Sequence, residues 1–596
     1  VVISGGKLLT NWTKYKDNIY KTNLNMNYGI RNMIYASGKM MHEARWPNSD
    51  NPLDVSSYAT VDSLSSDKSE VFDSDLQLPS DADYYDGAIM WSTTQPGYSS
   101  KLAQVAYYNA AAKSLSITGN TDIAPGSLYY LMRSLTLLDA ENEWYIDKSN
   151  NLYLYAPGGV NPSTIETEAR IRDYGFDLAG KSYITISGIS FRAVGINMDE
   201  DTTGCVISGG VFDGIDYYMP ATGNPRSTGL TVSGQYNTVR DCEIKNNYGP
   251  GIVLEGAHNN VINNHVHDVN YQHTYGGVVD GGAININGRD LLISHNTIHN
   301  VARDCISGKF KHCIVQYNDM YDYMILSKDG GGVYFAYYDF ENSEIHHNLV
   351  HDNKAIDTGI GIYLDSMVSG VIAYNNVIWN NPTYGIEVNS PNAYSAFYNN
   401  TVADIGNIGY FPSLEHMGSV FVNNIFSDSS FIKYNGQTPE PSAEMFYSNN
   451  LVGREYYDSE FQPMGGALEG GIPVYGVTDG YTGSAPDCGA YQSGTKKFTA
   501  GCDMKNKPYP KFEPNDRIPC INKMNNRAFE NGSFDSWTVN SGNPKVIKQS
   551  AWEYRETSIG FSGYYGAMLS AGDKIENTVT GLKPNTTYKI SAYGKI

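Results

Sequence analysis

The sequence has few cysteines and few positive charges for its length, and each shortage excludes a class of protein. It has 7 Cys in 596 residues. None has the CxxC spacing typical of zinc and redox sites, so we predict no metal and no cofactor. The 42 Lys and Arg residues are outnumbered by 63 Asp and Glu residues, which gives a net charge of −21. This charge argues against a nucleic acid or an anionic membrane surface as partner. No apolar run is long enough to cross a membrane, so we expect no membrane insertion.

A helical pattern is also missing from the middle of the chain, where one short phrase returns instead. Between Cys242 and Asp428, an Asn is followed by an apolar residue two positions on and by Asp or Asn four positions on, at intervals of about 22 to 32 residues. These phrases begin at Asn264, Asn296, Asn318, Asn348, Asn376, Asn400 and Asn424. A period of this length is typical of a parallel β-solenoid. We expect the Asn side chains to form an internal ladder, with one amide in each coil.

A second phrase recurs between the first ones, for example in Gly332-Val333-Tyr334-Phe335-Ala336. Strand side chains alternate between faces, so its second and fourth residues should point inward and its third and fifth outward. The predicted outward strip contains Val253, Asn285, Tyr334, Tyr363 and Glu387 beside Glu255, Asn287, Ala336, Asp365 and Asn389. Just before these strands, we expect a second acidic column of Asp280, Asp304, Asp329 and Asp357. Such a polar and aromatic strip favours binding of a sugar along one face.

These patterns predict an all-β protein: a right-handed parallel β-helix (solenoid) with an N-terminal β-rich module and a C-terminal β-sandwich. We place the N-terminal module at 1–175, packed on the first coils, and the β-helix at 176–430. Residues 431–525 are expected to form a loop-rich cap, because Gly and Pro become more frequent there. In residues 526–596, the phrases from Phe529 to Trp537 and from Gly581 to Tyr593 resemble the carbohydrate-binding β-sandwiches attached to secreted glycosidases. The chain starts at Val1 inside a strand-like phrase, which we interpret as a processed start.

Cleavage of a glycosidic bond usually needs two carboxyl groups, one to donate a proton and one to attack or to activate water. The densest candidate segment runs from Asp322 to Gly332. Asp322 closes one repeat phrase at a position that the other phrases fill with Asp or Asn, so a turn-forming role competes with catalysis. Asp329 precedes three glycines, which would let a ligand approach the backbone closely. Asp365 points outward one coil later and is a third candidate.

The solenoid and two N-terminal phrases together resemble a known enzyme family. The phrases are Glu43-Ala44-Arg45-Trp46-Pro47-Asn48 and Glu143-Trp144-Tyr145-Ile146-Asp147. The layout resembles glycoside hydrolase family 136, the β-helix lacto-N-biosidases of gut bacteria, and more loosely family 141. In family 136 the acid/base and the nucleophile are two Asp separated by six residues, which is the spacing of Asp322 and Asp329. The resemblance therefore implies that Asp322 is the acid/base and Asp329 the nucleophile of a retaining mechanism. In other β-helix hydrolases the partner lies a coil away, which keeps Asp365 open.

The resemblance also implies a substrate and partners. The expected product is galactosyl-β-1,3-N-acetylglucosamine, released from milk or mucin oligosaccharides outside a bacterium or at its surface. A helper subunit or domain for folding is a further expectation. We expect the sugar to be bound by Tyr334, Tyr363, Asp304, Asn287 and His273.

Two other functions remain open from the sequence. A polysaccharide lyase on this fold could use Arg303, Lys309, Lys311 or Lys328 to neutralise a uronate and abstract a proton. The acidic outer strips would repel such a polyanion. A non-catalytic glycan-binding solenoid would bind the sugar without turnover.

Overall fold

The computed structural model describes most of the chain up to residue 518 and short strands beyond it. The described residues are 1–24, 32–77, 85, 87–94, 97–119, 122–216, 229–271, 281–389, 392–403, 416–417, 419–427, 446–515, 517–518, 537–541, 545–548, 565–568 and 574–577. Within these residues there is no α-helix, and no helix is long and apolar enough to span a membrane. The short 3-10 helices are η2 (Val55–Ser57), η4 (Leu135–Leu137), η5 (Pro157–Gly159), η6 (Pro162–Thr164), η7 (Arg454–Tyr456) and η8 (Gly465–Ala467).

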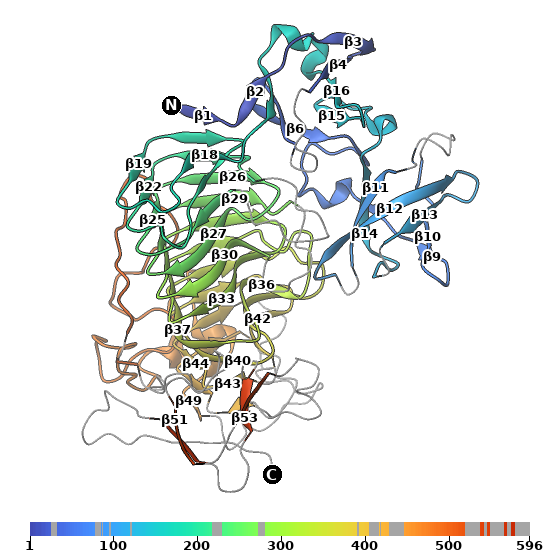
Figure 1. The fold of residues 1–596 in the computed structure, drawn as a ribbon. Helices are drawn as coiled ribbons and strands as arrows, with labels where there is room; N and C mark the ends of the chain where they lie inside the picture. Colours follow the sequence, from blue (N-terminus) through green and yellow to red (C-terminus); the bar gives the residue numbers. More distant parts are fainter. Residues whose placement is uncertain are drawn as a thin grey trace.

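Three long sheets with parallel strand pairing form the solenoid (Figure 1). The 12-stranded sheet contains β1 (Val2–Ser4), β20 (Ser190–Arg192), β23 (Val211–Asp213), β26 (Glu243–Asn247), β29 (His265–Val269), β32 (Thr297–Val301), β35 (Asp319–Tyr321), β38 (Leu349–His351), β41 (Val377–Trp379), β45 (Thr401–Ala403), β48 (Ile425–Phe426) and β50 (Leu451–Val452). The 9-stranded sheet contains β18 (Tyr174–Asp177), β21 (Gly195–Asn197), β24 (Leu230–Val232), β27 (Ile252–Ala257), β30 (Gly282–Arg289), β33 (Asp304–Lys311), β36 (Gly330–Phe335), β39 (Gly359–Leu364) and β42 (Tyr384–Val388). The 13-stranded sheet contains β19 (Thr185–Ser187), β22 (Val206–Ser208), β25 (Thr238–Arg240), β28 (Asn260–Ile262), β31 (Leu292–Ser294), β34 (Ile314–Gln316), β37 (Asp339–His346), β40 (Val368–Tyr374), β43 (Asn392–Ala393), β44 (Ala396–Tyr398), β46 (His416–Met417), β47 (Val420–Val422) and β49 (Phe446–Ser448).

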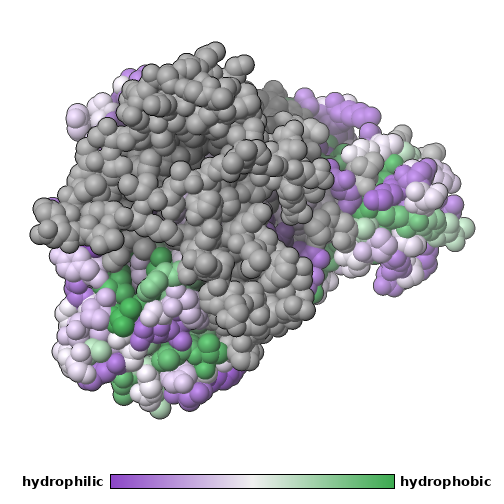
Figure 2. Space-filling view, turned by 90° about the horizontal axis from the view of Figure 1, so that it is seen from below, coloured by the Kyte–Doolittle hydropathy of each residue, from purple (hydrophilic) through white to green (hydrophobic). Residues whose placement is uncertain are grey.

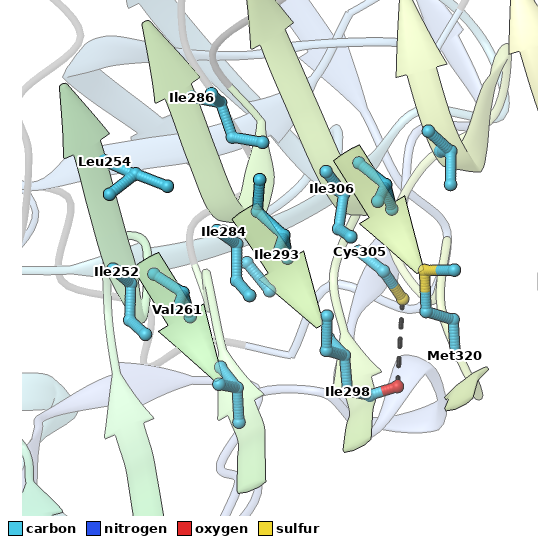
Figure 3. Packing of buried hydrophobic residues seen from close by; sticks show 14 of the residues in the cluster. Ile252, Leu254, Val261, Ile284, Ile286, Ile293, Ile298, Cys305, Ile306 and Met320 are labelled. Atoms are coloured by element: carbon cyan, nitrogen blue, oxygen red, sulfur yellow. Dashed lines mark hydrogen bonds between the residues drawn. The ribbon is translucent and has the colours of Figure 1, made fainter. Parts of the chain in front are cut away.

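The inside of the solenoid is a continuous hydrophobic core. Ile252 and Leu254 of β27 point inward, as do Ile284 and Ile286 on the next strand of the same sheet, and all four are buried (Figure 3). They face inward because apolar residues alternate with polar ones along each strand. Burial of each such side chain contributes about 1.5–3 kcal/mol. Similar side chains stack in successive coils, so the solenoid is stabilised along its whole length.

The predicted asparagine ladder is confirmed. Asn296 donates through Nδ2 to Oδ1 of Asn318 over 2.9 Å, and Asn318 donates in the same way to Asn348 over 3.0 Å. The ladder begins at Asn264 and continues to Asn450. The backbone N–H of each ladder Asn up to Asn424 also donates to the Oδ1 of the next coil, for example from Asn348 to Asn376 over 3.1 Å. Each buried amide is therefore satisfied by its neighbours, which fixes the register between coils.

The described strands between residues 6 and 170 form two mostly antiparallel sheets beside the solenoid (Figure 1). Trp91 and Tyr130 pack against Tyr271, Ala302 and Leu326, so the module reaches beyond the first coils on which we expected it to pack. The first contains β7 (Arg45–Trp46), β8 (Ala59–Thr60), β9 (Ser63–Leu64), β10 (Glu70–Phe72), β11 (Ile89–Thr93), β12 (Ser100–Asn109), β13 (Ser114–Thr118) and β14 (Leu128–Met132). The second contains β2 (Gly6–Leu8), β3 (Thr13–Lys16), β4 (Ile19–Asn23), β5 (Ile34–Ala36), β6 (Lys39–Glu43), β15 (Glu143–Ile146), β16 (Asn151–Tyr155) and β17 (Thr167–Arg170). Figure 2 shows this module projecting at the right, with hydrophilic and hydrophobic surface interspersed. Strand β1 does not belong to it, because Val2–Ser4 pairs with β20 of the solenoid.

The region that we expected to be a cap has two parts. Strands β49 and β50 extend the solenoid to Val452, beyond the predicted limit at 430. The chain then runs back along the outside of the coils as an irregular strap, residues 487–515, drawn in orange at the left of Figure 1. The strap is held by hydrogen bonds such as that from Asp503 N–H to Oδ1 of Asn263 over 2.7 Å. This segment therefore clamps several coils together.

Four short strands are described in the last 60 residues. They are β51 (Trp537–Ser541), β52 (Lys545–Lys548), β53 (Tyr565–Met568) and β54 (Lys574–Asn577), and they form two antiparallel pairs. The rest of the expected C-terminal sandwich lies outside the described residues, so the sandwich stays a prediction.

Candidate active site

The predicted outward strip exists on the 9-stranded sheet, with one coil more than expected. The register pairs Tyr334 with Tyr363 and Tyr363 with Glu387. Between Asn285 and Tyr334 the structure inserts Ser307 of β33. The recurring phrase does not predict this coil, because the coil has Cys305-Ile306 where the other phrases have a small residue followed by an apolar one.

Asp329 lies directly before β36 and accepts a hydrogen bond from a tyrosine. The Tyr363 hydroxyl donates to its Oδ1 over 3.2 Å. Burial and then the charge of Asp365 raise the pKa of Asp329 above its usual value, while Arg303 and Tyr363 act in the opposite direction. A raised pKa favours the protonated form, which is the form that a proton donor needs.

Asp365, just past the end of β39, is held by more donors than Asp329. Its Oδ2 accepts from the Tyr334 hydroxyl over 2.8 Å. Its Oδ1 accepts from the Ser366 N–H over 2.6 Å and from Nδ2 of Asn389 over 2.7 Å. Hydrogen bonds of this kind stabilise the negative form of a carboxylate. The two tyrosine rings meet edge to face with centroids 5.2 Å apart, so one aromatic pair orients both carboxyls.

Glu387 of β42 is a third carboxyl in the same group. It is 5% exposed, and its buried Oε2 has no hydrogen-bond partner among the described residues. Burial, followed by the charges of Asp329 and Asp365, raises the pKa of Glu387 far above its ordinary value. The sequence analysis placed Glu387 on the outward strip but not among the site residues. Its position beside Tyr363 was the signal that could have identified it.

Arg303 and Asp304 support the group from the start of the neighbouring strand β33, where Arg303 lies over the ring of Tyr334. Both side chains are fully buried and form a salt bridge with each other. Asp304 accepts from the Gly331 N–H over 2.9 Å, and Arg303 donates to the Asp329 carbonyl over 3.1 Å. Burial raises the pKa of Asp304 to about 6. The pair therefore positions the backbone after Asp329, whereas we had expected Asp304 to contact the sugar.

The expected acidic column is not one straight line. Gly330 pairs with Gly359, so Asp329 lies level with Thr358 and not with Asp357. Asp357 pairs with Lys328 over 3.1 Å at the surface. Asp280, the first member of the expected column, lies outside the described residues.

The glycines after Asp329 serve packing and not ligand approach. A Cβ on Gly332 would meet Cγ1 of Val350 at 2.5 Å, and one on Gly330 would meet Oδ1 of Asp304 at 2.5 Å. These contacts are with the protein itself, so any side chain there would collide with the coil. Our interpretation of the glycines as a ligand path was therefore wrong.

Asp322 occupies a turn in a different environment. It follows β35 and has a φ of 49°, close to the 52° of Asp268 and the 54° of Asp352 in the same column. Its Oδ1 accepts from Nζ of Lys354 over 2.8 Å. This column is a left-handed turn position, which Asp and Asn tolerate better than most residues. Within the described residues, Asp322 has no hydrogen bond to the group of Asp329, Asp365 and Glu387.

The other predicted residues are spread along the sheet. Tyr334 and Tyr363 are 0% and 3% exposed, so their hydroxyls orient carboxyls and their rings are not free for stacking on a sugar. Asn287 is exposed on β30 and pairs with Lys309, three strands from Asp365. His273 lies outside the described residues. The N-terminal module reaches this region, because Gly97 accepts a hydrogen bond from the Lys328 N–H over 3.3 Å.

A concave site elsewhere in the structure is lined by fewer carboxyls. It lies between the N-terminal module and the solenoid and is lined by Glu43, Arg45, Tyr58, Tyr248 and Tyr271, among others. Among the described residues that line it, Glu43 is the one carboxyl, and it pairs with Arg133 over 3.5 Å. Chemistry that needs two carboxyls is therefore better supported at Asp329.

The family comparison agrees with the coil architecture. The family model described as "Right handed beta helix region" matches residues 144–288 and 282–443, which together span half of the chain. The chain belongs to this right-handed β-helix family. The predicted fold class is thereby confirmed for the solenoid.

Comparison with solved β-helix structures found several similar chains at low identity. A chain titled "Glycoside hydrolase" is 14% identical with a TM-score of 0.42, and the match covers 76% of this chain and 82% of that chain. The structure of XylC with xylose is 12% identical with a TM-score of 0.36, over 76% of this chain and 72% of that one. Pectate lyase Pel9A is 15% identical with a TM-score of 0.34, over 48% of this chain and 79% of that one. No curated protein matched the sequence.

Proposed function

We propose that this β-helix protein is a carbohydrate-active enzyme, a glycoside hydrolase whose site is the group of Asp329, Asp365 and Glu387. The observation that carries the proposal is the presence of three interacting carboxyls: Asp329 directly before β36, Asp365 directly after β39 and Glu387 on β42. Like charges held together in a poorly hydrated place cannot all ionise, so at least one keeps a proton near neutral pH. A protonated carboxyl beside an ionised one is what glycosidic cleavage requires.

The contacts favour one division of roles. Asp365, with its several donors, is the carboxylate that attacks the anomeric carbon or activates water. Asp329, with one donor and a raised pKa, donates the proton to the leaving oxygen. Glu387 has a raised pKa, which favours its protonated form and so lowers the total negative charge of the group. The resemblance to family 136 instead makes Asp329 the nucleophile and Asp322 the donor, and both assignments require Asp329.

The substrate class rests on the resemblance. We propose release of galactosyl-β-1,3-N-acetylglucosamine from milk or mucin oligosaccharides by a secreted enzyme with retention of configuration.

A lyase is less well supported by the contacts. Three of its four candidate cations are already paired with the protein's own carboxylates: Arg303 with Asp304, Lys311 with Glu341 and Lys328 with Asp357. A uronate would have to compete with these partners.

The test is incubation of the protein with a panel of milk and mucin oligosaccharides, with the products identified by mass. A disaccharide product with a gain of one water supports the hydrolase. An unsaturated product absorbing in the ultraviolet would indicate a lyase, and binding without any product would indicate a lectin-like solenoid.

A further inference from the structure

A second group of polar side chains lies on another face, along the outside of the 12-stranded sheet. Glu243 of β26 pairs with His265 of β29, and His267 of β29 pairs with His299 of β32. The four side chains come from three successive coils and are partly buried. They belong to a different sheet from Asp329 and take no part in the proposed cleavage.

The ring nitrogens and the carboxylate converge closely. Nε2 of His265 and Nε2 of His299 are 2.8 Å apart, and Nε2 of His267 lies 3.2 Å from Oε1 of Glu243. One ligand atom from each of Glu243, His265 and His267 lies within 4.8 Å of the others. Atoms bound to one tetrahedral Zn²⁺ at about 2.0–2.1 Å stand about 3.3 Å apart, which is close to the 2.8 Å and 3.2 Å of these two contacts.

A carboxylate outside the group orients one ring. Oδ2 of Asp268 lies 2.6 Å from Nδ1 of His267, and Oδ1 of Asp268 accepts from Nδ2 of Asn300 over 3.2 Å. When Nδ1 donates to Asp268, Nε2 presents its lone pair to the group. An outer carboxylate on the second ring nitrogen is the usual companion of a metal-binding histidine.

Aromatic stacking holds a second ring in place. The ring of His299 stacks on Tyr321 with centroids 4.7 Å apart and on His267 with centroids 5.1 Å apart. A ring fixed in this way has already lost most of its rotational freedom, so it loses little more when it binds a ligand.

A lysine already competes for the same carboxylate. Nζ of Lys245 lies 2.7 Å from Oε1 of Glu243. A cation bound by the histidines would have to share Glu243 with this ammonium group or displace it.

We propose that Glu243, His265, His267 and His299 form a binding site for a divalent transition metal of the Zn²⁺ class. Three imidazoles and one carboxylate suit Zn²⁺ better than Mg²⁺ or Ca²⁺, which prefer oxygen ligands. Because the ligands come from three coils, the metal ties β26, β29 and β32 together. The absence of a CxxC motif led the sequence analysis to expect no metal. The ligands are spread over three repeats, so no short motif contains them.

The test is calorimetric titration of the untagged full-length protein, after chelator treatment, with ZnCl₂ and separately with CaCl₂ and MgCl₂. We expect saturable Zn²⁺ binding that raises the thermal midpoint, and no comparable effect of Ca²⁺ or Mg²⁺. His267→Gln and Glu243→Gln should each weaken Zn²⁺ binding by at least about 10-fold, and Asp268→Asn by about 10-fold or more.

Two matched variants make the test decisive. His351→Gln alters the same aromatic stack two coils beyond His299 and should leave Zn²⁺ affinity unchanged. Lys245→Met removes the competing ammonium and should tighten Zn²⁺ binding, a gain that misfolding cannot imitate. The proposal is overturned if the wild type does not take up Zn²⁺, if His267→Gln binds as tightly as the wild type, or if Lys245→Met does not increase the affinity.

Discussion

At the scale of single residues, the proposed chemistry depends on how burial and charge act on three carboxyls. Asp329, Asp365 and Glu387 have different numbers of hydrogen-bond donors, and this difference separates their roles. Sequence register could place Tyr363 and Glu387 side by side. It could not show that their side chains are buried, because burial depends on packing around the strip.

The protonation of Glu387 makes stability depend on pH. Its pKa is raised above the ordinary 4.5 in the folded state, so the favourable contribution of this group is fully present below about pH 4.5 and is lost as the pH rises through the raised value. Glu387→Gln cannot ionise and should avoid this loss. The thermal midpoint of the variant minus that of the wild type should therefore be larger at pH 8 than at pH 4.

The control for this experiment is Glu460→Gln, which changes an exposed side chain that follows β50 in the sequence. Equal midpoint differences for Glu387→Gln at the two pH values would show that Glu387 is ionised without penalty.

The division of roles between the aspartates can be tested with leaving groups. An aryl glycoside with an activated leaving group needs little protonation, so Asp329→Asn should keep much of its activity on that substrate but lose about 100-fold or more on the natural sugar. Asp365→Asn should lose activity on both substrates. The assignment fails if Asp329→Asn is inactive on both while Asp322→Asn is rescued by the aryl substrate, the pattern that the family resemblance implies.

At the scale of the elements, the solenoid could be predicted because each coil requires the same residue types at the same positions. The ladder position needs an amide that both donates and accepts, so Asn returns there and its period is visible in the sequence. The turn column of Asp268, Asp322 and Asp352 shows the limit of this approach. A carboxylate is suited both to a left-handed turn and to catalysis, so the sequence alone does not separate these two roles at Asp322. The structure does, because it places Asp322 in a left-handed turn with its carboxylate paired to Lys354.

The ladder makes a measurable contribution to stability. Asn348→Leu removes the two bonds that the Asn348 side chain donates, to Oδ1 of Asn376 and to the Val315 carbonyl, and leaves the side-chain amide of Asn318 without its acceptor. We expect a loss of about 1–3 kcal/mol in the free energy of unfolding, measured by chemical denaturation. Asn287→Leu, at an exposed position of β30, is the control. A loss no larger than that of the control would mean that the ladder does not stabilise the fold.

At the scale of the whole molecule, the parts outside the repeat were harder to predict. Strand β1 precedes the N-terminal module in the chain but pairs with β20 of the solenoid. The strap of residues 487–515 follows the last coils in the chain but returns along the outside of earlier ones. Neither has a period, and both depend on contacts between residues far apart in the chain. Such contacts have no local sequence signal. The same reason explains why the four candidate metal ligands were not predicted.

The central claim is that the protein cleaves a glycosidic bond and that Asp329 is essential for this cleavage. The most direct measurement is kcat/KM of the wild type and of Asp329→Asn on the oligosaccharide that the panel identifies as substrate, with sugar binding and thermal midpoint followed for both proteins. We predict that Asp329→Asn loses at least about 100-fold in kcat/KM while it still folds and binds the sugar. A folded Asp329→Asn variant that cleaves the oligosaccharide at the wild-type rate would contradict the account.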